Sequence, residues 1–340
     1  MVLIDIAIII IKIMIVIGGI ITTVAYLILA ERKVAGFIQE RYGPNRVGLW
    51  GLLQPIADGV KTLLKEDITP ARANRIIYHL APAMVLAPAL VTFAVVPFGS
   101  GIDAFGRHIA FQVADIGIGI LFIFAITSIG VYGVVLGGWS SNNKYSLLGG
   151  LRSSAQMISY EIALGLSVIG ILLLTGSLRL NDIVEAQIGM WNIFRQPVAF
   201  LIFLVAVFAE TNRLPFDLAE SEQELIAGYH IEYSGFKYSM FMLGEYSNII
   251  TASALIVTLF FGGWTVPFID VTKFGYWGAF LSVVSFAVKT GFFLFLYLWV
   301  RWTLPRFRYD QLMHLGWKVL LPLALLNLLF TAAWITYGGF

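Results

Sequence analysis

Eight long runs of apolar residues constrain the fold of this chain more than any other feature of its sequence. The runs cover residues 3–30, 79–98, 114–137, 155–178, 196–210, 246–268, 275–300 and 319–337. A helix of about 20 apolar residues crosses the ~30 Å hydrocarbon core of a bilayer. The sequence therefore predicts an all-α integral membrane protein with about eight transmembrane helices. The fifth run is short and leaves its own ends open. The first is too long for a cleavable signal peptide, so we expect the first helix to be retained.

Lysine and arginine are distributed unevenly over the loops between these runs. Loops 31–78, 138–154, 211–245 and 301–318 hold sixteen of the 22 basic residues, and the other loops hold four. Basic residues are enriched in loops on the cytoplasmic side of a membrane. We therefore expect these four loops on the inner side and both termini on the outer side. Residues 1–340 are predicted to form one transmembrane domain, with an inner loop at 31–78 and an acidic inner loop at 211–245.

The chain has no cysteine and only four histidines. Iron–sulfur clusters and disulfides need cysteine, so this chain builds neither. The histidines lie near the ends of the predicted helices, and none pairs with another across a span. We therefore predict no catalytic residue, no metal site and no cofactor bound by this chain alone. If the protein takes part in redox chemistry, the electrons travel on another subunit or on a diffusible carrier.

The first inner loop contains an amphipathic pattern after the turn at YGPN. Its apolar residues at helical spacing are Leu49, Leu53, Ile56, Val60, Leu63 and Leu64, and its polar residues opposite them are Gln54, Asp58, Lys61 and Lys65. A helix this short and charged is expected to lie in the plane of the membrane interface. Two interpretations stay open: a peripheral helix that only seals the bundle, or one wall of a pocket that admits a hydrophobic ligand from the membrane.

Six of the twenty acidic residues fall in one stretch, AETNRLPFDLAESEQELIAGYHIEY, at 209–233. Pro215 interrupts the preceding helix, and we expect Asp217 to begin a new one. Spacings of three and four would then place Asp217, Glu220 and Glu224 on one helix face. The plain interpretation is a solvated helix start, where carboxylates favour the positive end of the helix dipole.

Acidic residues also occur within or at the ends of the predicted spans. Charge inside a membrane is costly, so such residues face a bundle interior or a water-filled cavity and often mark ion paths. Crowded carboxylates titrate as a coupled set and pass protons among themselves. We therefore predict a proton path that includes Glu31, Glu161, Glu210, Asp217, Glu220, Glu222, Glu224 and Glu245. Lys289 also lies within a span, and the sequence leaves open whether it is structural or belongs to this path.

Four inner segments together resemble the signature segments of one family. They are ERKVAGFIQERYGPNRVG with QPIADGVKTLLKED, GGWSSNNKYSLLGGLRSSAQMISYE, AETNRLPFDLAESEQELIAGYHIEYSG, and PRFRYDQLMHLGWK. The family is the quinone-site membrane subunit of the proton-pumping NADH:quinone oxidoreductase, respiratory complex I (the H subunit in bacteria, subunit 1 in mitochondria). The resemblance covers all four inner loops and the order and number of the helices.

The resemblance implies a translocase subunit that forms the membrane-side part and entrance of the quinone chamber. Quinone would be the substrate, while FMN and the iron–sulfur clusters would belong to partner subunits. The implied partners are the peripheral-arm subunits around the terminal cluster, the small and antiporter-like membrane subunits, and the lipid bilayer, with no nucleic acid. The location would be the bacterial cytoplasmic membrane or the mitochondrial inner membrane. The residues matched to quinone binding are Arg32, Asp58, Arg213 and Arg301.

Two other functions remain as alternatives. A stand-alone proton-coupled transporter would use the same acids, but it predicts inverted repeats that this sequence does not display. The related membrane subunit of ion-pumping hydrogenases resembles this family without binding quinone. The GPNRVG and QPIAD segments together with the acidic run at 220–224 favour the quinone enzyme.

Overall fold

The computed structural model describes residues 2–104, 107–217, 228–267 and 274–338. Within them, seven helical segments are long and apolar enough to cross a membrane. They are α1 (Val2–Ile38), α3 (Arg75–Thr92), α4 (Gly119–Ser140), α5 (Lys144–Thr175), α9 (Gly235–Phe260), α10 (Gly275–Thr303) and the continuous segment formed by α11 (Tyr309–His314), η4 (Leu315–Leu320) and α12 (Leu321–Thr336). This confirms the prediction of an all-α integral membrane protein.

The fifth apolar run forms a shorter helix, α8 (Pro197–Glu210). Pro197 stands in its first turn, where a missing backbone N–H costs nothing. The helix ends at Glu210, at an end that the sequence had left open. Its 14 residues fall short of the ~20 that span a bilayer core alone.

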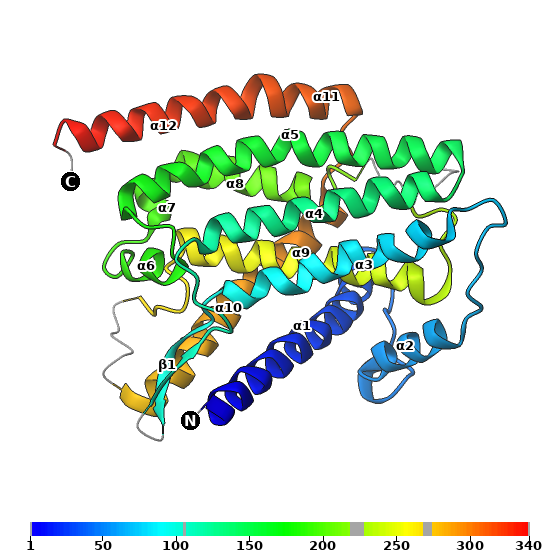
Figure 1. Ribbon diagram of the computed structural model, residues 1–340, viewed down its shortest axis with the longest axis horizontal. Helices are drawn as coiled ribbons and strands as arrows, with labels where there is room; N and C mark the ends of the chain where they lie inside the picture. The colour runs from blue at the N-terminus through cyan, green and yellow to red at the C-terminus, as the bar shows by residue number, and fades with distance from the viewer. Residues whose placement is uncertain (1, 105–106, 218–227, 268–273, 339–340) are drawn as a thin grey trace.

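Helix α9 is the central element of the bundle. It packs against α3, α10 and α1. In the most apolar stretch of 18 residues in this helix, 78% of the residues are buried inside the protein. Helix α5 packs against α4, α8 and α12. In Figure 1, α12 lies along one edge of the bundle and α1 along the opposite edge. Most of the side chains of α1 and α12 are exposed, as expected for helices that face lipid or another subunit.

Several helices continue beyond the apolar runs that predicted them. Glu31 was expected to close the first helix, but α1 continues to Ile38. Glu161 was expected about a third of the way into its helix and Glu245 at the start of its own, but α5 begins at Lys144 and α9 at Gly235. An apolar run reports the length embedded in lipid, whereas a helix continues through polar residues wherever neighbouring elements pair with them. These three glutamates therefore lie well inside helices.

The amphipathic segment of the first inner loop forms α2 (Gln54–Leu64), preceded by the 3₁₀ turn η1 (Leu49–Gly51). The apolar residues Ile56, Leu63 and Leu64 are 63%, 67% and 82% exposed. The polar residues Gln54 and Asp58 face the rest of the protein instead. The helix therefore presents its apolar side outward, as the interfacial prediction requires. The end of the bundle that carries this helix is called the α2 end below.

The opposite end of the bundle contains a β-hairpin that the sequence did not predict. Strands β1 (Gly99–Ala104) and β2 (Arg107–Phe111) pair antiparallel and lie against α10 (Figure 1). The backbone N–H of Ser100 donates to the hydroxyl of Ser282 in α10 at 3.1 Å. A Cβ at Gly99 would lie 2.5 Å from the Phe111 ring, so only glycine fits there. The remaining short elements are η2 (Phe93–Val95), α6 (Leu180–Glu185) and α7 (Asn192–Arg195).

Candidate functional site

Two arginines and two glutamates from distant parts of the chain meet inside the α2 end. Arg213 Nε lies 2.6 Å from Glu245 Oε1, and Arg213 Nη1 lies 3.8 Å from Glu31 Oε2. The other oxygen of Glu31 lies 2.5 Å from Arg301 Nη1. The order of contacts is therefore Arg301, Glu31, Arg213, Glu245. These four residues are called the ion network below.

Tyr246 completes the ion network with two contacts of its own. Its hydroxyl donates to Glu31 Oε2 at 2.7 Å, and the Arg213 guanidinium lies 4.2 Å from its ring centre. A guanidinium over an aromatic face gains a cation–π interaction. Tyr246 directly follows Glu245 in the chain but was not among the predicted site residues.

The charges of the ion network are largely removed from water. The side chains of Arg213, Glu245, Glu31 and Arg301 are 8%, 6%, 10% and 17% exposed. Desolvating charges is costly, and pairing offsets the cost only when the charges balance. Two arginines against two carboxylates give that balance. Any change of charge beside this network therefore alters the energy of all four residues.

A cavity of about 310 Å³ adjoins the ion network. Its polar lining is Glu31, Arg32, Asp58, Thr62, Asn212, Arg213, Asp217, Tyr238, Ser239, Glu245, Tyr246 and Arg301, and its apolar lining is Ile28, Leu214 and Met242. Sites for small molecules commonly combine apolar walls with a few polar groups that orient the ligand. All four residues matched to quinone binding line this one cavity. The structure thus brings together what the sequence assigned from separate loops.

Arg32 and Asp58 join α1 to α2 at the edge of this cavity. Arg32 Nη1 donates to Asp58 Oδ2 at 2.7 Å, and Asp58 Oδ1 lies 2.6 Å from Lys61 Nζ and 2.9 Å from Gln54 Nε2. Partial burial opposes ionisation of Asp58, but the hydrogen bonds from Lys61 and Gln54 and the charge of Arg32 outweigh it and lower its pKa. Asp58 is therefore an anion that fixes α2 against α1.

Asp217 lines the same cavity and pairs with Arg306, with Nη2 and Oδ2 3.2 Å apart. The Arg306 side chain is 19% exposed. Arg306 was not among the predicted site residues, so its contact with the Asp217 carboxylate adds a residue to the site. Three other predicted site residues, Glu220, Glu222 and Glu224, lie outside the described residues.

Glu210 and Glu161 lie apart from the ion network. Glu210 lines a second cavity of about 30 Å³ between α4, α5, α8 and α9, which has room for about one water molecule. Glu161 accepts a hydrogen bond from the Ser128 hydroxyl in α4. The two carboxylates are close enough for their charges to interact. Among the described residues, the predicted proton path therefore falls into two groups. Glu31, Asp217 and Glu245 line the larger cavity, and Glu210 lines the smaller one near Glu161.

The segment 210–213 connects the two cavities. Glu210 and Thr211 line the smaller one, whereas Asn212 and Arg213 line the larger one. Asn212 adopts a positive φ of 50°, which turns the chain from one cavity to the other. Asparagine tolerates this conformation better than most residues.

Lys289 is held by backbone carbonyls beyond the end of α9. Its ammonium donates to Phe261, Gly263 and Thr265 oxygens at 2.9, 3.1 and 2.6 Å. It also lies 4.9 Å from the Trp191 ring centre. A cation is favoured at a helix C-terminus, where carbonyls lack partners. Between the two interpretations left open, these contacts favour a structural role.

Comparison with known proteins identifies the family. The sequence profile described as NADH dehydrogenase matches residues 11–332. The chain belongs to the NADH dehydrogenase family. This confirms the resemblance found in the four inner segments.

Curated relatives of the NADH dehydrogenase family match almost the whole chain. In Geobacter sulfurreducens, the NADH-quinone oxidoreductase H subunit numbered 2 is 54% identical over 324 residues, which cover 95% of each chain. The H subunit numbered 1 of the same enzyme in Geobacter metallireducens is 53% identical over 331 residues, 97% of each chain. NADH-quinone oxidoreductase subunit 8 of Rhodothermus marinus is 53% identical over 329 residues, covering 93% of this chain and 94% of its own. These relatives are subunits of an enzyme complex.

Proposed function

We propose that this chain forms the membrane-side part and entrance of the quinone chamber in an NADH-quinone oxidoreductase. The observation that carries the proposal is the ion network at the head of the 310 Å³ cavity. A quinone needs hydrogen-bond donors for its carbonyl oxygens and apolar walls for its isoprenoid tail. The arginines and Tyr246 supply donors, while Ile28, Leu214 and Met242 supply apolar contact. Helix α2 beside the cavity, with its exposed apolar face, suits entry from the membrane.

The quinone would be reduced by electrons from a partner subunit. The chain contains no cysteine to hold an iron–sulfur cluster. We therefore assign FMN and the clusters to partner subunits in the peripheral arm, and the pumping channels to antiporter-like and small membrane subunits. The basic inner loops favour a cytoplasmic membrane with the α2 end inside and both termini outside.

Reduction of a quinone draws protons and changes the charge beside the ion network. We propose that this change propagates through Arg213 and the 210–213 segment to Glu210 and Glu161. The balanced, buried charges support this, because a new charge in a desolvated site shifts the energies of all its neighbours. Asp217 would extend the path at the cavity. Glu220, Glu222 and Glu224, which lie outside the described residues, are proposed to belong to the same path. In the assembled complex, the partner subunits would then move the protons across the membrane.

A cavity-filling substitution tests the quinone assignment. Met242→Trp places a larger side chain into the cavity and is expected to raise KM for a short-chain quinone by about tenfold, ~1.4 kcal/mol of lost binding. The matched control is Leu326→Trp on α12, where the side chain is 63% exposed. Both variants are assayed in the complex purified under mild detergent, as inhibitor-sensitive NADH:quinone reduction. Unchanged KM in Met242→Trp would contradict the proposal, as would purification of the chain with a hydrogenase or alone.

A further inference from the structure

The 30 Å³ cavity beside Glu210, called the Glu210 cavity below, shares no lining residue with the 310 Å³ quinone cavity. Helices α4, α5, α8 and α9 surround it, and most of its lining is apolar. The polar side chains that line it are Thr127, Glu210, Thr211, Asn248 and Thr251. One water molecule needs roughly 10–15 Å³ of such space and two to four polar partners. The Glu210 cavity meets the requirement for space, so the polar side chains decide whether it can bind water.

The three threonine hydroxyls of this cavity already donate their protons elsewhere. Each donates to a backbone carbonyl four residues earlier on its own chain, at 3.0 or 3.1 Å. A hydroxyl bonded in this way keeps its lone pairs, so the threonines offer the cavity acceptors. Among the described side chains that line the cavity, only Asn248 has N–H groups. A water oxygen in this cavity would therefore accept its hydrogen bond from the Asn248 amide.

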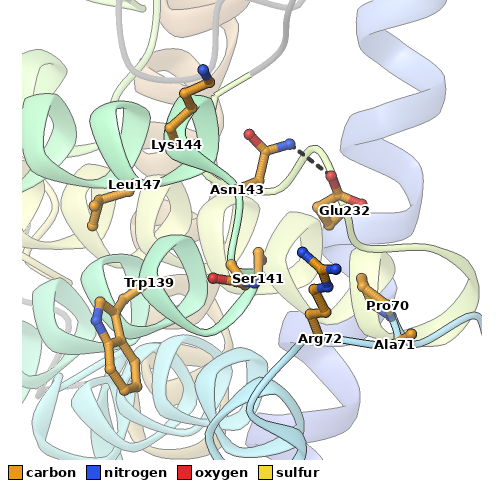
Figure 2. A pocket seen from close by; sticks show the side chains of 10 residues that line it. Pro70, Ala71, Arg72, Trp139, Ser141, Asn143, Lys144, Leu147 and Glu232 are labelled. Atoms are coloured by element: carbon orange, nitrogen blue, oxygen red, sulfur yellow. Dashed lines mark hydrogen bonds between the residues drawn. The ribbon is translucent and has the colours of Figure 1, made fainter.

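Asn248 and Glu210 face this cavity without a hydrogen bond from either side chain to any residue that the structure describes. A different asparagine shows the direct contact that is possible between an amide and a carboxylate. At the α2 end, Asn143 donates to the Glu232 carboxylate at 2.7 Å (Figure 2). Polar groups that are removed from bulk water are stabilised by a partner, which can be a bound water molecule. One water molecule between Asn248 and Glu210 would satisfy both side chains.

Helix α9 connects Asn248 to the ion network. Asn248 follows Glu245 by three residues, so the two positions lie about 4.5 Å apart along the helix axis and on the same side. Glu245 Oε1 lies 2.6 Å from Arg213 Nε in the ion network. A displacement of Glu245 would therefore move Asn248 with it, because both project from one helical turn. Helix α9 thus carries one residue of each site, as the 210–213 segment does.

We propose that Asn248 and Glu210 together bind one water molecule in the Glu210 cavity, and that Asn248 positions this water for proton exchange at Glu210. The inference rests on the proposed function, because it adds a positioning residue to the proposed proton path. When Glu210 is ionised, the water accepts from the Asn248 N–H and donates to the carboxylate. When Glu210 is protonated, its O–H donates to the water, which donates to the Asn248 oxygen. An amide has both a donor and an acceptor and therefore serves both arrangements.

A density map of the assembled wild-type complex, at a resolution that shows ordered water, tests the site without any variant. The expected result is one peak within hydrogen-bond distance of both the Asn248 amide and the Glu210 carboxyl. A cavity with no peak, or a peak that contacts only one of the two side chains, would overturn the proposal. A partner-subunit side chain in this space would overturn it as well.

Two substitutions on α9 test the role of the water in coupling by different routes. Asn248→Leu removes the amide, whereas Ala252→Val adds two methyl groups at the cavity wall and displaces the water while keeping the amide. Both are expected to lower the number of protons pumped per NADH severalfold in reconstituted vesicles. Asn248→Ser keeps a hydroxyl and leaves room for water, so it should retain more pumping than Asn248→Leu.

Asn327→Leu and Ala254→Val are the matched controls. Asn327 donates to Gln196 Oε1 at 2.9 Å, and Ala254 is fully buried on α9. Neither residue lines the Glu210 cavity or the quinone cavity. Both control variants should pump the wild-type number of protons per NADH.

The same assays separate failure of this inference from failure of the proposed function. A wild-type complex without inhibitor-sensitive quinone reduction would contradict the proposed function itself. If the wild type reduces quinone and pumps, normal pumping in Asn248→Leu or in Ala252→Val would overturn the inference alone. Equal losses in Asn248→Leu and Asn248→Ser would also overturn it, because they would assign the effect to the packing of α9.

Discussion

The side-chain amide of Gln156 in α5 donates to the carbonyl oxygen of Ala209 at 2.7 Å. The same Nε2 lies 2.9 Å from the Phe216 carbonyl and 3.1 Å from Asn212 Oδ1. Asn212 in turn donates to the Ser153 hydroxyl, one turn earlier on α5. A single, fully buried glutamine thus holds the chain on both sides of the 210–213 segment that connects the two cavities.

Gln156→Leu is expected to disturb quinone reduction and coupling together. The change removes the donor and leaves buried carbonyls unsatisfied, at a cost of about 1–3 kcal/mol. Since segment 209–216 carries Glu210 and Arg213, its displacement should raise the quinone KM and lower the number of protons pumped per NADH. Both quantities are measured in the purified complex reconstituted into vesicles.

Gln187 provides the matched control for this prediction. It is also buried, and its Nε2 donates to the Ile183 and Thr258 carbonyls at 3.0 and 2.8 Å. It lies toward the β-hairpin end and lines neither the quinone cavity nor the Glu210 cavity. Gln187→Leu should lower complex yield without changing KM or proton yield per NADH. If both substitutions changed KM and the proton yield per NADH equally, the role of Gln156 would be purely structural.

The sequence predicted the membrane-spanning helices better than it predicted contacts between side chains. Apolar run length identifies membrane-spanning segments because the bilayer sets that length. The predicted end of α1 and the predicted starts of α5 and α9 were wrong, because contacts between polar residues, and not the lipid, determine those helix ends. The quinone residues were selected by resemblance, yet nothing in the chain order indicates that Glu31 lies between Arg213 and Arg301. Tyr246 and Gln156 were missed because neither charge nor periodicity distinguishes them.

Lys289→Met is expected to destabilise the protein without altering coupling. The ammonium bonds three carbonyls beyond α9, and loss of these bonds should cost about 2 kcal/mol. Less assembled complex should be recovered, but the complex that forms should pump the wild-type number of protons per NADH. A fall in that number at normal yield would place Lys289 on the proton path instead.

Because His230 is buried, we expect the region around it, beside the quinone cavity, to lose stability in acid. It is 4% exposed, and burial lowers its pKa to about 4, against about 6.5 in the unfolded chain. Between pH 4 and pH 6.5, His230 binds a proton when this region is unfolded but not when it is folded. The folded state is therefore fully stable above pH 6.5 and loses about 3 kcal/mol as the pH falls to 4.

Hydrogen–deuterium exchange of residues 228–234 measures this loss directly. After correction for intrinsic exchange rates, the free energy of local opening in the purified complex should fall as the pH is lowered from 7 to 4.5. His230→Phe keeps an aromatic ring against Tyr229 and Tyr238 but does not titrate, so its opening energy should vary less. The same pH dependence in both proteins would assign the effect to another group.

Glu161→Gln and Glu210→Gln are expected to separate electron transfer from proton pumping. Neither glutamate lines the quinone cavity, so NADH oxidation with a short-chain quinone should persist. Glutamine keeps the size of the side chain but cannot take up and release a proton, which would interrupt a path through these two residues. Proton uptake by vesicles per NADH oxidised should fall severalfold in each variant. Glu185→Gln, at an exposed position near the β-hairpin end, is the control and should pump normally. If both Glu161→Gln and Glu210→Gln pumped normally, neither glutamate would belong to the proton path. Coupling would then depend on the ion network alone.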